Sequence, residues 1–383
     1  MSPEPFTVTI TKETLADMYE RLATTRWPDE ISGSGWEYGT NLAYLKELIA
    51  YWQDGFDWQV QETAINRFAH FRAEVDGSGI HFIHERGKGK NPIPLVLLHG
   101  WPATFTQMLK VIPLLSDPKD HGGDFTDSFD VVVPSLPGFG FSDRPTGPGM
   151  SCACMGEMIH TLMTKELGYS QYAVRGSDIG AEIARHLAHA HPESIIGIHL
   201  SGATPLMGPP PADLSPAEQQ YLGAGQMWMM TEGAYCMVNS TKPQTLAYGL
   251  NDSPAGLAAW IVEKFRAWSD CSGNVETRFT KDELLTNLTI YWATGTINSS
   301  CRVYCETMRN MSPSAGRRID VPTGMAQFPK DLVPAVRAWE VRFYNLRHWM
   351  EMPRGGHFAE MEEPDLLAED IREFFRPPRE LMD

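Results

Sequence analysis

The chain lacks the features that would direct it to a membrane, to export or to nucleic acid. Met1–Thr7 contain neither a basic segment nor an apolar core, so no signal peptide is predicted. The longest apolar runs, such as Leu95–Leu98, have only the length of a strand. No long basic run is present, and 32 basic residues against 48 acidic ones give a net charge of −16. We therefore expect a soluble, cytoplasmic protein that has no membrane anchor and binds no nucleic acid.

Cysteine is scarce as well. The six cysteines show no zinc-binding spacing with a nearby histidine, and they form no pattern typical of a disulfide-stabilised secreted domain. No metal site is expected. With 383 residues and 42% hydrophobic residues, the chain is long enough for one large domain with insertions, or for two domains.

Strand and helix patterns alternate in the central part of the chain. Continuous apolar runs predict strands that a parallel sheet buries on both faces. Strands are expected at 93–98, 129–133, 171–174 and 195–200, with helices at 106–115, 154–167 and 181–187 between them. This order predicts a mostly parallel, doubly wound α/β sheet.

Other segments precede, interrupt and complete this alternation. Before it we expect a strand at 6–10, helices at 11–24 and 41–52, and a hairpin formed by 68–75 and 80–85. After the proline-rich segment Gly208–Pro211, a helical region rich in aromatic residues and Met, about 215–315, is interpreted as a cap over the carboxyl edge of the sheet. Strands at 319–326 and 341–349 and a helix at 366–375 complete the chain. We expect four parts: an N-terminal segment at 1–85, the first part of the α/β core at 86–210, the helical cap at 211–317 and the second part of the core at 318–383.

The segment Gly176–Gly180, Gly-Ser-Asp-Ile-Gly, lies between an expected strand and an expected helix. A sharp strand-to-helix turn needs small residues two before and two after a central residue whose side chain it exposes. This is the nucleophile-elbow pattern, with Asp178 where an esterase carries serine. The alternative is a Gly-x-Asp-x-Gly turn without a catalytic role.

An aspartate nucleophile would form an ester, and hydrolysis of that ester needs a general base. His357 is the best candidate, because it lies in a Gly-Gly-His-Phe loop late in the chain, between the last strand and the last helix. A carboxylate must orient this histidine. Asp331, 26 residues earlier, is a candidate, and the spacing leaves Asp320 and Glu306 as rivals.

Two further groups suit this chemistry. The loop His99-Gly100-Trp101-Pro102 follows a buried strand, so the backbone N–H groups of Trp101 and Ile179 could form an oxyanion hole. A tyrosine of the cap could protonate the oxygen that leaves when a strained ring opens. The residues alone do not choose among the cap tyrosines, which are Tyr221, Tyr235, Tyr248, Tyr291 and Tyr304.

Taken together, these motifs resemble those of the microsomal-type epoxide hydrolases of the α/β-hydrolase superfamily, over nearly the whole chain. The segments that carry the resemblance are the N-terminal meander 6–58, the HGWP loop at 99–102, the core loop 137–142, the cap signatures 241–245 and 251–257, and the histidine loop 355–359. Each segment is a weak signal alone. Their number and order make the match strong, and it implies an α/β-hydrolase fold with an inserted helical cap and an N-terminal meander.

By position, the resemblance implies Asp178 as the nucleophile, His357 as the base, Asp331 as the acid, and Tyr235 and Tyr304 as the proton donors. Some relatives have Glu where this chain has Asp331. Many have an aromatic residue after the nucleophile, where this chain has Ile179, so the pocket near the elbow should differ in shape.

The expected activity is hydrolysis of an epoxide to a vicinal diol without metal or organic cofactor. The substrate should be a small, apolar or aromatic epoxide, because the cap is rich in Met and Trp. A haloalkane or haloacid dehalogenase, which also uses an elbow aspartate, is one alternative, and a degenerate hydrolase that only binds ligands is another. A serine esterase is disfavoured by Asp178. The sequence does not identify the physiological substrate. It also does not decide whether the enzyme acts in detoxification or in secondary metabolism, or whether it forms a homodimer.

Overall fold

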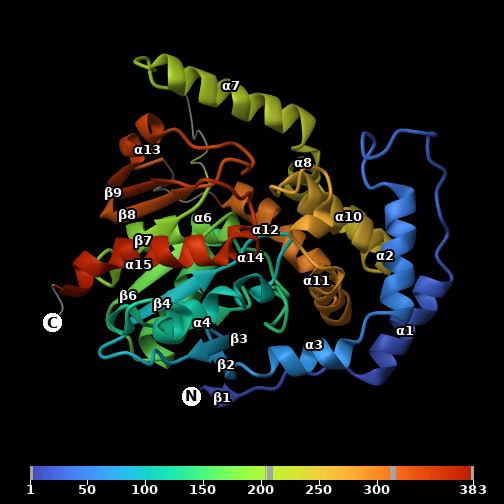
Figure 1. The fold of residues 1–383 in the computed structure, drawn as a ribbon, viewed down its shortest axis with the longest axis horizontal. Coiled ribbons are helices and arrows are strands. Elements are labelled where there is room, and N and C mark those ends of the chain that lie inside the picture. Colours follow the sequence, from blue (N-terminus) through green and yellow to red (C-terminus); the bar gives the residue numbers. More distant parts are fainter. Residues whose placement is uncertain (1–2, 203, 205–209, 311–315, 381–383) are drawn as a thin grey trace.

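One nine-stranded sheet organises the protein. The computed structural model describes residues 3–202, 204, 210–310 and 316–380, and its strands are ordered β1-β2-β3-β5-β4-β6-β7-β8-β9 (Figure 1). They span Glu4–Pro5 (β1), His70–Val75 (β2), Ser78–Glu85 (β3), Ile93–Leu98 (β4), Phe129–Pro134 (β5), Tyr172–Gly176 (β6), Ile195–Leu200 (β7), Ile319–Gln327 (β8) and Tyr344–Glu351 (β9). Strands β4 to β9 are parallel, whereas β1, β2 and β3 form an antiparallel edge that joins β5. The expected α/β-hydrolase fold is confirmed.

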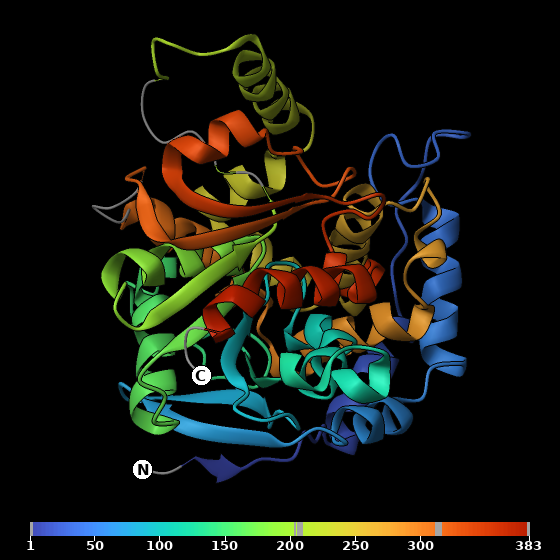
Figure 2. The same ribbon diagram turned by 60° about the vertical axis from the view of Figure 1, so that its left-hand side comes forward.

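Helices cover both faces of the parallel strands, which explains why these strands are continuous apolar runs. On one face, α4 (Val111–Ser116) packs with α15 (Pro364–Glu380), which crosses β7, β8 and β9 (Figure 2). On the other face, α6 (Ile179–Ala190) packs on β4, β6 and β7 and contacts α5 (Cys152–Thr161). The parallel strands are therefore buried between two layers of helices.

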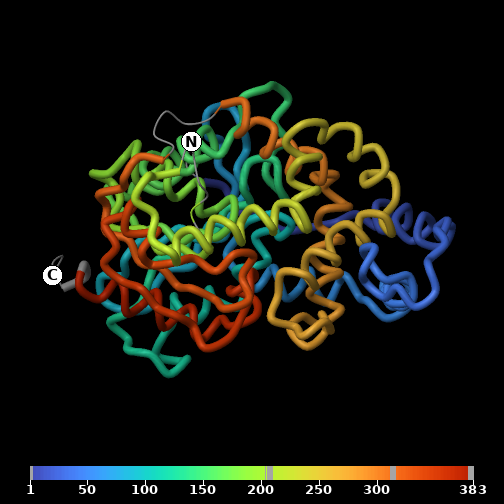
Figure 3. Tube along the Cα trace, turned by 90° about the horizontal axis from the view of Figure 1, so that it is seen from above, coloured from blue at the N-terminus to red at the C-terminus, as the bar shows by residue number. Residues whose placement is uncertain are grey.

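The N-terminal segment supports the cap. Its helices are α1 (Lys12–Ala23), α2 (Leu42–Asp54) and α3 (Trp58–Ile65), and the side chains of Thr11 and Asn41 cap the first two. Figure 3 shows this blue segment beside the gold cap helices, and α1 and α2 contact both α10 and α11. The Trp52 indole donates to Thr289 Oγ1 at 3.1 Å. The meander thus braces the cap from the side away from the sheet.

In the sequence, the cap is inserted between β7 and β8. It consists of α7 (Pro216–Thr231), α8 (Ala234–Thr241), α9 (Pro243–Leu250), α10 (Pro254–Ala267), α11 (Lys281–Thr294) and α12 (Ile297–Arg309). Reciprocal capping boxes start α7, at Ser215 and Glu218, and α11, at Thr280 and Glu283. The proline-rich segment 208–211 lies partly outside the described residues, and the end of the expected cap, 311–315, lies wholly outside them. No helix in the described ranges is both long and apolar enough to cross a membrane.

Four expected elements differ from the structure, wholly or in part. Segment 6–10 is not a strand, because its backbone N–H groups donate to side chains instead of to a neighbouring strand. Val8 N donates to Asn66 Oδ1 at 2.9 Å, and Ile10 N donates to Glu62 Oε1 at 2.9 Å. The expected helix at 106–115 is a 3₁₀ turn, Phe105–Met108, followed by α4, because Pro113 cannot donate to a carbonyl one turn earlier.

The expected strand 341–349 begins late, at Tyr344, because α13 (Arg337–Phe343) precedes it. Contacts from distant parts of the chain fix this short helix: the Trp339 indole donates to Thr204 O at 2.9 Å, and Glu340 accepts from Thr204 N at 3.0 Å. The expected helix 154–167 begins earlier, at Cys152, and changes to a π-helical turn at Leu162–Glu166.

A carboxylate on α15 ties the last helix to two strands. Asp370 accepts from His199 of β7 at 2.8 Å and from His348 of β9 at 2.6 Å. Burial opposes the charge on Asp370, but hydrogen bonds from both histidines lower its pKa to about 2. The hydrogen bond to Asp370 raises the pKa of His348 above 6.5, whereas burial lowers the pKa of His199. His348 therefore carries the positive charge of this cluster.

We expect the His348–Asp370 pair to make stability depend on pH. Protonated His348 stabilises the folded state fully below pH 6.5, and this contribution is lost as the pH rises through the higher folded-state pKa. Because solvent screens the half-buried imidazole, His348→Gln should cost about 1 kcal/mol at pH 6 and less at pH 9. Urea unfolding of both proteins at the two pH values measures this. The exposed His121→Gln serves as control, and an equal loss at both pH values would contradict the assignment.

Candidate active site

Asp178 occupies a strained turn directly after β6. Its backbone has φ 52° and ψ −126°, a conformation that non-glycine residues rarely adopt. The flanking glycines allow the turn: a Cβ on Gly176 would lie 2.3 Å from Gly180 O, and a Cβ on Gly180 would lie 2.1 Å from Leu98 O. The turn therefore presents the Asp178 carboxylate at the carboxyl edge of the sheet, as the elbow pattern predicts.

The two oxygens of this carboxylate have different surroundings. Trp101 N donates to Oδ1 at 2.9 Å, and the Ile179 backbone N–H also donates to the carboxylate. Oδ2 faces His357 Nε2 at 3.5 Å. Burial raises the pKa of Asp178, but the His357 charge and these hydrogen bonds outweigh it and hold the pKa below its usual value. Asp178 is thus an oriented, ionised carboxylate.

His357 lies between two carboxylates. Its Nδ1 is 2.7 Å from Asp331 Oδ1, which leaves Nε2 turned toward Asp178. Burial lowers the pKa of His357, but Asp331 and Asp178 together raise it to about 10. Lys330 N donates to Gly355 O at 3.1 Å and joins the loop after β8 to the histidine loop after β9. The structure therefore brings Asp178, His357 and Asp331 together.

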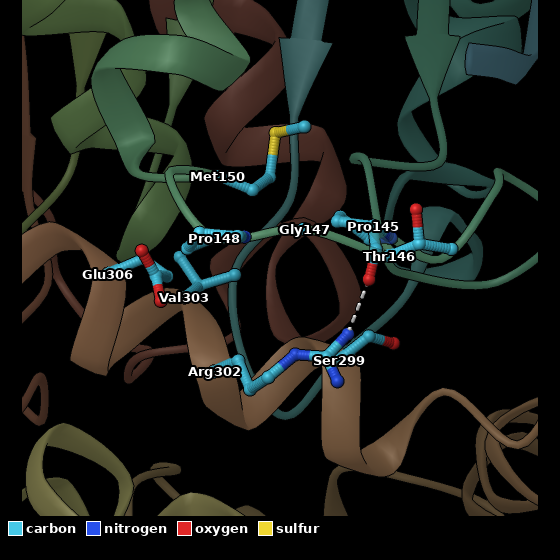
Figure 4. A pocket seen from close by; sticks show the side chains of 9 residues that line it. All are labelled: Pro145, Thr146, Gly147, Pro148, Met150, Ser299, Arg302, Val303 and Glu306. Atoms are coloured by element: carbon cyan, nitrogen blue, oxygen red, sulfur yellow. Dashed lines mark hydrogen bonds between the residues drawn. The ribbon is translucent and has the colours of Figure 1, made fainter.

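The rival acids lie elsewhere. The Asp320 side chain is 94% exposed. Glu306 accepts from Gly149 N at 2.7 Å and lines a small cavity of about 200 Å³ between α12 and the loop 145–150 (Figure 4). Arg302, one turn earlier on α12, donates to Pro145 O at 2.9 Å in the same cavity. Neither carboxylate is near His357, so Asp331 is its partner by geometry.

Hydrogen bonding and exposure distinguish the five cap tyrosines from one another. The hydroxyls of Tyr221 and Tyr291 donate to the backbone oxygens of Thr204 and Ala103, and Tyr248 is 74% exposed. Tyr235 of α8 and Tyr304 of α12 are the two that remain. Their ring centroids lie 6.0 Å apart, edge to face, and the Tyr304 hydroxyl has no partner among the described residues.

Both remaining tyrosines lie close to the elbow. The Tyr235 ring stacks on Trp101 at 5.2 Å, and the Tyr304 ring meets Trp101 edge-on at 6.0 Å. Burial, followed for Tyr235 by the charge of Asp178, raises the pKa of Tyr235 well above 10, and burial does the same for Tyr304. Both hydroxyls therefore keep their protons at neutral pH and can donate hydrogen bonds.

A cavity of about 840 Å³ opens above these residues. Asp178, His357 and Asp331 line it from the sheet and its loops, and Tyr235 lines it from the cap, whereas Tyr304, Trp101 and Ile179 do not line it. The opposite wall comes from α7 and the loop after Asp331, through apolar side chains that include Leu222, Trp228, Met229, Met230, Leu332 and Val333. This volume fits a small or medium-sized apolar molecule.

Several residues that shape the site were not predicted. Glu362 holds the histidine loop: its carboxylate accepts from the backbone N–H groups of Gly356, Phe358 and Asp270 at 2.8–3.1 Å. Burial raises the pKa of Glu362 to about 7. Its position five residues after His357 was the only signal in the sequence.

A buried ion pair lies beneath the elbow. The Arg175 guanidinium, at the end of β6, donates to Glu360 Oε1 at 2.8 Å, and neither residue is exposed. Glu360 also accepts from Ser177 Oγ at 3.2 Å and from Gln107 Nε2 at 2.7 Å. The pair therefore ties the residues before Asp178 to the helix that follows His357.

Within the described ranges, His348, Asp370 and Glu373 are the one group whose side chains could surround a metal ion. None of them lines the large cavity, and Asp370 already accepts a hydrogen bond from His348. The residues at Asp178 are suited to nucleophilic and acid–base chemistry rather than to metal binding.

Comparisons with known proteins identify the family of the chain. Residues 3–108 match the epoxide hydrolase N-terminus family, and residues 93–235 match the α/β-hydrolase fold family. A Stigmatella aurantiaca protein, provisionally named an epoxide hydrolase, is 43% identical over 98% of this chain and 85% of its own length. Epoxide hydrolase 1 of Sus scrofa is 36% identical over 97% and 88%.

Solved structures give the same result. Juvenile hormone epoxide hydrolase from the silkworm Bombyx mori superposes with a TM-score of 0.90 at 31% identity, over 100% of this chain and 96% of that one. The Aspergillus niger epoxide hydrolase has a TM-score of 0.86 at 30% identity, over 98% and 97%. The chain belongs to the epoxide hydrolase family of the α/β-hydrolase superfamily.

Proposed function

We propose that this enzyme converts an epoxide to a vicinal diol through an ester formed on Asp178. The observation that carries the proposal is that the two oxygens of its carboxylate have different contacts. Oδ1 is held by the Trp101 amide, whereas Oδ2 faces His357 Nε2 at 3.5 Å. One oxygen is thus free to attack carbon, and the other already occupies the place of the ester carbonyl.

In the first step, Oδ2 attacks a ring carbon and the carbon–oxygen bond of the epoxide breaks. Tyr235 and Tyr304 hydrogen-bond the departing oxygen and supply its proton. The tyrosines regain that proton from solvent, and His357 releases its own proton to solvent once the ester has formed. Ester formation also removes the negative charge of Asp178, one cause of the raised pKa of His357, so the imidazole then holds its proton less tightly.

In the second step, neutral His357, oriented by Asp331, takes a proton from water. The hydroxide adds to Cγ of Asp178, and the Trp101 and Ile179 N–H groups stabilise the oxyanion on Oδ1. Collapse releases the diol oxygen, which takes the proton from the imidazolium. The acid proton of Asp178 then returns to His357, and the resting state is restored without any cofactor.

Direct trapping tests this sequence. Purified enzyme mixed with styrene oxide should form phenylethanediol. Acid quenching within the first turnover should leave the mass of the epoxide on the peptide that contains Asp178. Diol formation without an adduct on this peptide in any quench would contradict the covalent route.

A dehalogenase reaction has one observation in its favour. The indole N–H groups of Trp101 and Trp268 have no hydrogen-bond partner in the part of the chain that the structure describes, and such donors can bind a leaving halide. The paired tyrosines favour the epoxide. Release of chloride or bromide from haloalkanes at a rate above that of diol formation would reverse this assignment.

We expect the tyrosines to act in the first step only. The double variant Tyr235→Phe/Tyr304→Phe should lower the rate of ester formation about 100-fold or more, because the leaving oxygen loses both proton donors. Tyr248→Phe, on an exposed ring, should leave it unchanged. Stopped-flow tryptophan fluorescence under single-turnover conditions measures this rate. A double variant as fast as the wild type would remove the tyrosines from the mechanism.

A further inference from the structure

Lys264 is a buried lysine next to the active site. It lies on α10 and is only 7% exposed, which is rare for lysine. Its ammonium group is 5.2 Å from the centroid of the Tyr235 ring and 5.7 Å from that of Trp268. Lys264 does not line the large cavity, so a substrate there does not touch it.

The charges near Tyr235 act on its hydroxyl group in opposite directions. The ring is enclosed by Trp101 at 5.2 Å and Trp268 at 5.1 Å, and the negative charge of Asp178 lies nearby. Burial and the Asp178 charge oppose a negative phenolate oxygen and raise the pKa of Tyr235. The lysine cation over the ring acts in the opposite direction, because electron density on the ring increases as the hydroxyl gives up its proton.

The neighbouring Glu263 does not cancel this effect. Its carboxylate forms an ion pair with the ammonium group of Lys264. The Glu263 side chain is 23% exposed, however, whereas the side chain of Lys264, taken without its backbone, is 9% exposed. Solvent therefore screens the carboxylate better than the ammonium group. The pair also fixes the lysine, which the aromatic rings hold from the other direction.

We propose that Lys264 is a positioning residue that stabilises the negative charge developing on Tyr235 as the epoxide ring opens. The proposal rests on the proposed function. The interaction is stronger in the transition state than in the resting enzyme, since the phenol is neutral at rest, so it should speed ester formation and leave ester hydrolysis nearly unchanged.

The first test separates the two steps. Lys264→Met should slow ester formation about ten- to thirty-fold in single-turnover fluorescence, and should change the rate of ester hydrolysis less than about twofold. Lys264→Arg should restore most of the rate, because a guanidinium also stacks on aromatic faces. Lys281→Met removes a lysine 5.7 Å from the Tyr51 ring, outside the cavity, and should leave both rates unchanged.

A double-mutant cycle tests the role of Tyr235 itself. In a Tyr235→Phe background the phenol is gone, so Lys264→Met should cost less than about twofold. Lys264→Gln, tested in parallel, gives the same comparison if the methionine variant does not fold. An equal loss with and without the Tyr235 hydroxyl, or equal slowing of both steps, would overturn the proposal.

The wild-type measurement keeps the two proposals apart. If the wild-type protein forms no adduct and no diol from styrene oxide, the proposed function fails. If it forms both and the lysine variants react at the wild-type rate, only the role of Lys264 is excluded.

Discussion

Asp178→Asn should lower diol formation by about 10⁴-fold or more, because an amide oxygen carries no charge with which to attack the ring carbon. The asparagine side chain has nearly the same size and can still accept from the Trp101 amide, so the fold should survive. Initial rates with styrene oxide, followed by chromatography of the diol, measure the loss. Asp178→Ala, which can neither attack nor be hydrolysed back to aspartate, should be at least as inactive.

The control for this prediction is folding. Thermal unfolding of Asp178→Asn should resemble that of the wild type, because the strained backbone at this position accommodates asparagine nearly as well as aspartate. A folded variant that retains one per cent of wild-type turnover would show that Asp178 is not the nucleophile.

His357→Gln should separate the two chemical steps. Ester formation should continue, because Oδ2 of Asp178 remains free to attack, whereas hydrolysis should fall about 10³-fold or more without a base for the water. The variant should therefore consume one equivalent of epoxide and stop. Intact-protein mass spectrometry should then find the whole population heavier by the mass of the substrate.

Two comparisons make this result specific. His121→Gln, at an exposed histidine, should turn over like the wild type. Asp331→Asn should hydrolyse the ester slowly rather than not at all, because His357 remains but loses the carboxylate 2.7 Å from its Nδ1. If His357→Gln released diol without accumulating the ester, another group would be the base.

The sequence predicted the positions of the site residues that local backbone geometry sets. Gly176 and Gly180 allow the turn at Asp178, and the glycines before His357 mark its loop, so both positions could be recognised from short motifs. Asp331 could not be separated from Asp320 and Glu306 by spacing. Only the packing of the loop after β8 against the histidine loop brings one of the three to His357.

The elements that were mispredicted depend on contacts between distant segments. Segment 6–10 has the alternation of a strand, but Asn66 and Glu62 take its hydrogen bonds. Helix α13 depends on Trp339 and Glu340 meeting Thr204. No motif marks Arg175, Glu360 or Glu362, because each has a partner far away in the sequence: Arg175 pairs with Glu360, and Glu362 accepts from Asp270 N.

In the proposed mechanism, the unequal surroundings of the two Asp178 oxygens decide which atoms end up in the product. Oδ2 attacks the ring carbon and leaves with the diol, while the oxygen of water replaces it. Oδ1, held by the Trp101 amide, stays with the protein. By this route one diol oxygen would come from the enzyme rather than directly from solvent, and water would renew the Asp178 carboxylate in every cycle.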